Sequence, residues 1–192
     1  MSRRLAGIAC MLLLAGCSGA EQPVAPASVA SPAIKPVPVA AADTDTLARY
    51  DGYGDMRFGM DEATFDKSWS GELKGAPGQD STCFYKTPKW VESPRDFAFM
   101  FEDGRFVRYD VGTAKEAAPG GGRVGMDEAQ IRTLYGARVQ VQPHKYVAGA
   151  KYLRIAALQG DGALVFETDE HGKVTRWRVG VLPQVDYVEG CG

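Results

Sequence analysis

The arrangement of apolar positions along the chain predicts short strands separated by tight turns. Residues 97–101 (FAFMF) and 106–111 (FVRYDV) flank an Asp-Gly pair at 103 and 104. Asp-Gly between two apolar runs is a strong hairpin signal. Residues 163–168 (ALVFET) and 174–181 (VTRWRVGV) form a second pair around a turn that contains Gly172. The pattern therefore predicts two hairpins.

The alternation within the first hairpin also assigns residues to faces. With a period of two, Val107, Tyr109 and Val111 share one face of the strand. The opposite face then carries Phe106, Arg108 and Asp110. Two shorter segments, "CFYK" at 83–86 and "KYLR" at 151–154, precede the hairpins at similar distances. We expect a third strand at each of them.

Two helices are predicted to begin with the same five residues, Gly-Met-Asp-Glu-Ala, at 59–63 and 125–129. Asp61 and Asp127 occupy N-cap positions, where a carboxylate accepts bonds from first-turn amides. A methionine precedes each N-cap aspartate, and an apolar residue follows that aspartate four positions later. This is the spacing of a hydrophobic staple. We expect Trp69 on the buried face of the first helix, and Gly71 and Gly136 at the two helix ends.

The order of these features is the same in both halves, which indicates an internal duplication. "DGRFVRYDVG" at 103–112 aligns with "HGKVTRWRVG" at 171–180, and a helix opening precedes each. We predict an α+β fold made of two tandem helix–β–β–β units, about 49–115 and 116–192. They are expected to form one antiparallel sheet with the helices on one face. The glycine run at 120–122 is interpreted as the hinge between the units.

The N-terminus is predicted to be a signal peptide, residues 1–16. Arg3 and Arg4 precede an apolar run that is too short for a membrane span. The run ends in Leu-Ala-Gly-Cys at 14–17, which resembles the lipobox of bacterial lipoproteins and implies lipidation of Cys17. In that family, Ser18 implies transfer to the outer membrane, facing the periplasm or the cell surface. Residues 17–48 are rich in Ala and Pro and are interpreted as a disordered tether.

Cysteine and charge counts narrow the classes of function. Cys10 leaves with the signal peptide and Cys17 carries the lipid, so Cys83 and Cys191 remain, and in an oxidising compartment we expect them to form a disulfide. Two separately buried thiols are the alternative.

The formal net charge of −2 becomes more negative once Arg3 and Arg4 are removed, and no basic block is present. A nucleic-acid partner is therefore not expected.

The sequence contains no set of residues with the spacing of a catalytic or metal site. His144 and His171 are the only histidines, and both are assigned to loops. The adjacent acidic pairs at the helix starts point in different directions, so they are interpreted as caps. No triad, metal-ligand cluster or phosphate-binding glycine motif is recognised. We therefore predict no enzymatic activity and no cofactor.

The aromatic residues are the best candidates for binding. Tyr and Trp anchor many protein interfaces, and their rings also stack on sugars. Trp90 and Tyr146, in loops beside proline, are the expected exposed residues, although any one aromatic residue could instead belong to the core. The full set of candidate partner- or ligand-binding residues is Trp90, Tyr146, Tyr85, Tyr152, Arg108 and Arg176.

The second unit, from "RVGM" at 123–126 through "LYG" at 134–136 to the hairpin "LVFETDEHGKVTRW", resembles the BamE (SmpA/OmlA) family of outer-membrane lipoproteins. The unit in tandem is similar to the repeat of secreted β-lactamase inhibitory proteins, which grip another protein with a concave sheet. The chain is also loosely similar to xanthomonad-type lipoproteins labelled lectins. These resemblances imply an envelope-assembly accessory or an inhibitor, which binds a protein through the concave sheet face and loops. Carbohydrate binding is the alternative, and a structural spacer is a third.

Overall fold

The computed structural model describes residues 46–192, in which both predicted hairpins are present. The signal peptide, Cys17 and the tether up to residue 45 lie outside the described residues. The Thr46 hydroxyl donates to the Ala117 carbonyl oxygen at 2.8 Å, and Ala48 is buried. Thr46 and Ala48, which the sequence placed in the tether, therefore pack on the folded domain. Neither helix within residues 46–192 has the length and apolar character of a membrane span.

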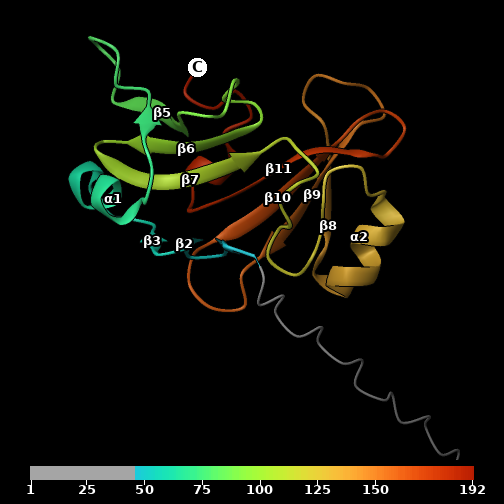
Figure 1. The fold of residues 1–192 in the computed structure, drawn as a ribbon. Coiled ribbons are helices and arrows are strands. Elements are labelled where there is room, and N and C mark those ends of the chain that lie inside the picture. Colours follow the sequence, from blue (N-terminus) through green and yellow to red (C-terminus); the bar gives the residue numbers. More distant parts are fainter. Residues whose placement is uncertain (1–45) are drawn as a thin grey trace, which may run out of the picture. The chain divides into compact units, whose positions relative to one another are not determined.

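The strands form an eight-stranded antiparallel sheet in the order β4-β5-β6-β7-β11-β10-β9-β8 (Figure 1). The fold class is α+β, as predicted. The short outer strands β4 and β8 were not expected, because neither has a clear alternation of its own. The strand bounds are β4 Leu73–Lys74, β5 Cys83–Pro88, β6 Phe97–Glu102, β7 Arg105–Val111, β8 Gln140–Pro143, β9 Lys151–Ala156, β10 Ala163–Thr168 and β11 Val174–Gly180.

Both helices begin at the predicted caps. The Asp61 carboxylate accepts from the Thr64 amide before α1 (Glu62–Ser68). Asp127 and Gln130 form a complete capping box before α2 (Glu128–Tyr135), which ends at Gly136 as expected. Two short 3₁₀ helices, η1 (Gly136–Arg138) and η2 (Gln184–Asp186), follow α2 and β11.

The prediction that α1 extends to Gly71 is wrong. The helix ends at Ser68, and Trp69 is the C-cap, with an extended backbone and its amide donating to the Phe65 carbonyl oxygen. The Trp69 ring packs edge-on against Phe99, with the ring centroids 5.2 Å apart. The extended backbone at Trp69 ends the helix two residues before Gly71.

The assignment of Phe106 to the face of Arg108 is also wrong. The β6–β7 register shifts between Met100 and Phe101, so that Met100 pairs with Arg108 but Phe101 pairs with Phe106. Val107 is the extra residue of a bulge, which turns Phe106 to the same face as Tyr109. A corresponding shift in β10–β11 pairs Glu167 with Arg176 and Thr168 with Val174, leaving Thr175 unpaired.

The core lies between the helices and one face of the sheet. Phe65 of α1 and Ile131 and Tyr135 of α2 belong to one buried cluster with the sheet residues Phe99, Phe166 and Trp177. A small three-stranded sheet, β1 (Ala48–Arg49), β2 (Gly52–Tyr53) and β3 (Met56–Arg57), adds Tyr53 to this cluster. Burial of apolar side chains in this cluster favours folding through the hydrophobic effect.

The glycine run at 120–122, interpreted above as a hinge, is held in place by Tyr135. The Tyr135 hydroxyl accepts from the Gly122 amide at 3.0 Å and donates to the Pro119 carbonyl oxygen at 2.9 Å. A Cβ atom at Gly122 would lie 2.3 Å from Cζ of Phe166. Gly122 is therefore required for close packing on the core.

The repeated Gly-Met-Asp segments join each helix to its hairpin. Gly59 donates to the Phe106 carbonyl oxygen, and Phe106 donates back to Met60. The second half has the same pair of bonds. The Gly125 amide donates to the Val174 carbonyl oxygen, and the Val174 amide donates to the Met126 carbonyl oxygen. These bonds fix the start of each helix over the last strand of its own hairpin.

Candidate functional site

The six candidate binding residues occupy very different environments. Trp90 and Tyr146 are the exposed members, with 74% and 60% of their surfaces accessible. Arg108 and Tyr152 are buried, and Tyr85 and Arg176 are partly buried. By side-chain exposure, Trp90 and Tyr146 are therefore surface residues, and the other four candidates belong to the sheet.

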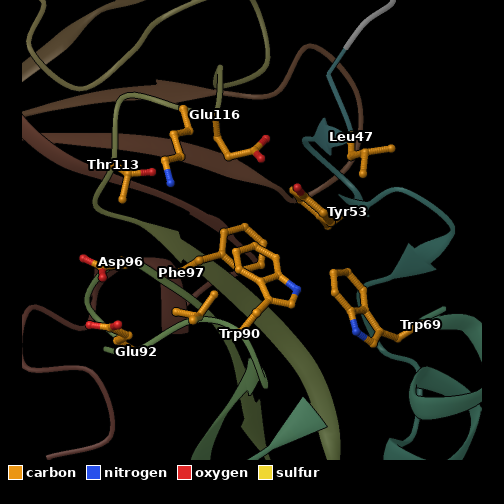
Figure 2. Close-up of a pocket in the computed structure, with 11 residues that line it drawn as sticks. Leu47, Tyr53, Trp69, Trp90, Glu92, Asp96, Phe97, Thr113 and Glu116 are labelled. Atoms are coloured by element: carbon orange, nitrogen blue, oxygen red, sulfur yellow. The ribbon is translucent and has the colours of Figure 1, made fainter. Parts of the chain in front are cut away.

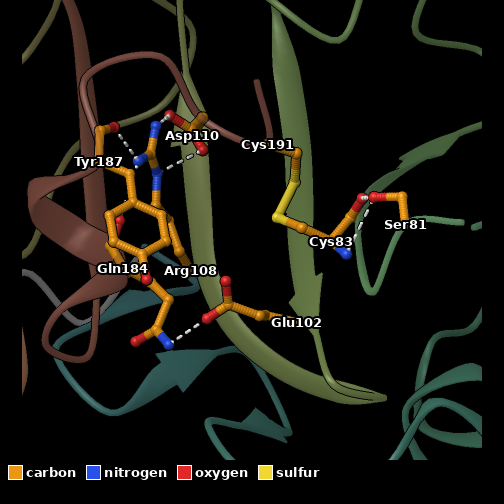
Figure 3. The surroundings of a disulfide bond; sticks show 8 residues. All are labelled: Ser81, Cys83, Glu102, Arg108, Asp110, Gln184, Tyr187 and Cys191. Atoms are coloured by element: carbon orange, nitrogen blue, oxygen red, sulfur yellow. Dashed lines mark hydrogen bonds and ion pairs between the residues drawn. A yellow bond between two sulfur atoms is a disulfide. The ribbon is translucent and has the colours of Figure 1, made fainter.

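Arg108 lies beneath the C-terminal segment, residues 181–192 (Figure 3). Its guanidinium forms two bonds with the Asp110 carboxylate, at 2.6 and 2.9 Å, and donates to the carbonyl oxygens of Gln184 and Tyr187. Only 1% of the Arg108 surface is accessible. Arg108 therefore cannot contact a partner, and it holds the C-terminal segment on the sheet.

Asp110 is the shared acceptor of this buried ionic cluster. Arg176 also donates to Oδ1 of Asp110, at 3.0 Å. Burial by itself raises the pKa of the Asp110 carboxyl group. The charge and hydrogen bonds of Arg108, with the charges of Arg176 and Arg178, outweigh burial, and the pKa is lowered from 3.8. Asp110 is thus ionised in the folded protein at neutral pH.

The predicted disulfide between Cys83 and Cys191 is present and fixes the end of the same segment to β5 (Figure 3). Tyr85 lies beneath the segment as well, since a Cβ atom at Gly190 would be 2.4 Å from the Tyr85 hydroxyl oxygen. Val185 and Val188 pack against Tyr152, which stacks on His144 with ring centroids 4.7 Å apart. The middle of the expected concave face is therefore covered by the chain itself.

Tyr146 is exposed but partly restrained. Its hydroxyl donates to the Glu189 carboxylate, which also accepts from Lys145 at 3.0 Å. His144, assigned to a loop from the sequence, holds the turn, because its Nδ1 accepts from the Tyr146 and Val147 amides at 3.0 and 3.1 Å. His144 Nε2 lies 3.1 Å from Glu167. These hydrogen bonds fix the turn at residues 144–147.

Trp90 lines an open pocket of about 450 Å³ (Figure 2). This volume is within the usual range for small-ligand sites. The pocket is built by five separate segments: the start of the described chain, β2, the end of α1, the β5–β6 loop with the first residue of β6, and the loop after β7. Its aromatic residues are Tyr53, Trp69, Trp90 and Phe97, and its polar residues are Glu92, Asp96, Thr113, Lys115 and Glu116.

The aromatic wall is anchored in the core at its base. Tyr53 packs edge-on against Phe97, with centroids 5.0 Å apart, and both are almost fully buried. Trp69 is held by Phe99. In Figure 2, Trp69 lies on one side of the Trp90 ring, and the carboxylates of Glu92 and Asp96 lie on the other. The pocket thus has an aromatic base held by core contacts, with polar side chains around it.

The acidic side chains of the pocket have no basic partner among the described residues. Within residues 46–192, neither Glu92, Asp96 nor Glu116 forms an ion pair. Burial and then the nearby Glu116 carboxylate raise the pKa of Tyr53 well above its ordinary value. No group of three acidic, His or Cys side chains in this part of the chain is arranged to hold a metal ion.

Sequence reasoning selected Trp90 but not the rest of this pocket. Trp69 was assigned to a helix face, and Glu92, Asp96 and Glu116 were not singled out. The available signal was Trp90-Val91-Glu92 in a loop flanked by prolines. Nothing local to the sequence indicated that Tyr53 and Trp69 would lie beside it.

Comparisons with known proteins add little to this geometry. No protein-family model matches the chain, and no curated protein matches it. Among solved structures, the fold is similar to an extracellular protein containing an SCP domain from Bacillus anthracis, with 10% identity and a TM-score of 0.45. The match covers 77% of this chain and 49% of that one, so the chain spans about half the length of that protein.

Proposed function

We propose that this chain is a non-enzymatic lipoprotein of the bacterial envelope that binds a protein partner through the Trp90 pocket. The observation that carries the proposal is Trp90 itself, exposed beside a pocket with an aromatic base. Exposed tryptophans in such settings are typical binding hot spots. Because the C-terminal segment covers the middle of the sheet, the binding surface lies at the loops around Trp90 instead of on the concave face.

The lipid anchor is part of this proposal and rests on the N-terminal sequence. Lipidation of Cys17 would place the domain at the outer membrane, with the Ala- and Pro-rich tether between lipid and fold. Cys17→Ala is expected to release the protein from the membrane fraction, since no other anchor is proposed. Fractionation of cells that express each form, with immunoblotting, measures the change. Retention of the variant in membranes would refute the anchor.

We also propose that the domain arose from two copies of one unit. Each half has a capped helix bonded to the last strand of its hairpin, and each hairpin carries a bulge at the corresponding position, Val107 or Thr175. Chance resemblance of two sequences would not reproduce the same bulge. A duplicated fold supports the resemblance to tandem-repeat inhibitory proteins and to single-repeat assembly lipoproteins. The two candidate roles are therefore an inhibitor and an assembly accessory.

Replacing Trp90 tests the site. Trp90→Ala is expected to weaken capture of the partner about 30-fold, because a hot-spot aromatic contributes about 2 kcal/mol or more. Tyr146→Ala is the matched control, since Tyr146 is similarly exposed but does not line the pocket. The measurement is affinity capture from crosslinked cells that express each form at equal levels, followed by identification of the captured protein.

The identity of the captured protein distinguishes the two roles. Barrel-assembly components lost with Trp90→Ala would indicate an assembly accessory, and a single enzyme lost in the same way would indicate an inhibitor. Equal capture by Trp90→Ala and the wild-type protein would place the binding site elsewhere and contradict the proposal.

Carbohydrate binding is the second candidate. The faces of Trp69 and Trp90 could stack on a sugar ring while the carboxylates accept bonds from its hydroxyl groups. Binding of soluble peptidoglycan fragments to the purified protein, lost with Trp90→Ala and without a protein captured from cells, would favour this function.

A further inference from the structure

The Trp90 pocket has a marked imbalance of charge. Glu92, Asp96 and Glu116 contribute three carboxylates, and Lys115 is the single basic residue of the lining. Every ion pair formed within residues 46–192 involves other acidic side chains. Glu116 lies beside the Tyr53 hydroxyl, whereas the carboxylates of Glu92 and Asp96 are exposed and available to pair with a cation brought by a ligand.

The aromatic residues reinforce this preference. The face of an indole ring carries negative potential, and Trp attracts a cation more strongly than Tyr or Phe does. A guanidinium group is planar, stacks on aromatic rings and forms paired hydrogen bonds with carboxylates. It can therefore contact Trp90 by its face while its N–H groups reach Glu92 or Asp96, which lie on the side of Trp90 away from Trp69 (Figure 2).

Two other occupants agree less well with the lining. A phosphate or carboxylate ligand would be repelled by three carboxylates. A neutral sugar could stack on the aromatic faces and donate its hydroxyl groups to the carboxylates, but it would leave their negative charge unneutralised. The carboxylates of this pocket also do not converge into a group that could hold a metal ion, within residues 46–192.

We propose that the pocket receives an arginine side chain of the protein partner, stacked on Trp90 and paired with the surrounding carboxylates. This inference rests on the proposed function and names the chemistry of the contact. It implies that binding weakens with added salt, because charge pairing at a partly exposed site is screened. It also implies discrimination against a neutral side chain of the same shape.

A short capped peptide with one central arginine, and the same peptide with citrulline in its place, provide the test. Citrulline keeps the planar shape and length but is uncharged. The protein is the full mature chain carrying Cys17→Ala, labelled with ¹⁵N and titrated with each peptide to about 10 mM, which detects dissociation constants in the millimolar range. The arginine peptide is expected to shift the indole N–H signals of Trp69 and Trp90 but not that of the buried Trp177.

Charge variants separate the pocket from the general charge of the protein. Glu92→Gln, Asp96→Asn and Glu116→Gln together are expected to weaken binding of the arginine peptide at least tenfold. The matched control neutralises three exposed carboxylates outside the pocket, with Asp80→Asn, Asp161→Asn and Glu170→Gln, and should bind like the unmodified chain. Thermal unfolding of both variants verifies that they are folded.

Several results would overturn the inference. These are equal binding of the arginine and citrulline peptides, no shift with either peptide, or equal loss of binding in the pocket variant and its control. If partner capture depends on Trp90 but is unchanged in the pocket charge variant, the arginine contact is wrong and the proposed function stands. If capture does not depend on Trp90, the proposed function itself fails.

Discussion

Asp110→Ala is expected to lower the free energy of unfolding by about 3–5 kcal/mol, which is typical of removing one partner from a buried ion pair. Asp110 is 1% exposed and bonds to both Arg108 and Arg176. Without its carboxylate, Arg108 would remain buried with only carbonyl oxygens as acceptors. Urea denaturation, followed by tryptophan fluorescence, measures the loss.

Asp110→Asn separates charge from shape and predicts a pH dependence. The folded-state pKa of Asp110 is lowered from 3.8, so the ionised group adds stability that is fully present above pH 3.8 and is lost as pH falls through the folded pKa. The difference in stability between wild type and Asp110→Asn should therefore be constant near neutral pH and shrink below about pH 4. A difference that does not change down to about pH 2 would contradict the assignment.

Removing the disulfide should have an effect of similar size. Cys83 and Cys191 are 108 residues apart in the sequence, and a loop of this length corresponds to about 4–5 kcal/mol in the chain-entropy model. The double variant Cys83→Ser, Cys191→Ser is expected to unfold at a much lower urea concentration than the parent chain carrying Cys17→Ala. Faster hydrogen exchange in residues 181–192 should accompany the change, because the disulfide fixes that segment to β5.

The parent chain under reducing conditions provides the control. It should resemble the double variant with reductant present, and the double variant itself should be unaffected by reductant. Identical urea midpoints for parent and double variant without reductant would show that the disulfide does not contribute to stability.

The local elements could largely be predicted, because their causes lie within a few residues. The Asp127 capping box and the hairpin turn at Gly104 depend on side chains and backbone preferences close in sequence. The faces of β7 could not be assigned correctly, because the bulge at Val107 arises from pairing with β6 and shifts the alternation at one position. The end of α1 was missed for a similar reason, since Trp69 packs on Phe99 of a different element.

The candidate site was predicted only in part. Trp90 was recognised from its loop, but the other pocket residues come from segments that are distant in sequence. Both Arg and Trp are residue types enriched at protein interfaces, so the sequence offered no reason to prefer Trp90 over Arg108. Only the structure shows that the Gln184 and Tyr187 carbonyl oxygens bind it inside the protein.

The sequence by itself determined the α+β class, the helix starts and the pairing of Cys83 with Cys191. Tertiary structure decided which polar and aromatic side chains are available to a partner. The physical reason is that the periodic pattern of apolar residues shows which side chains share a face of a strand or helix. It does not show which segment, distant in sequence, packs over that face. The C-terminal segment covers Arg108, whereas no described segment covers Trp90.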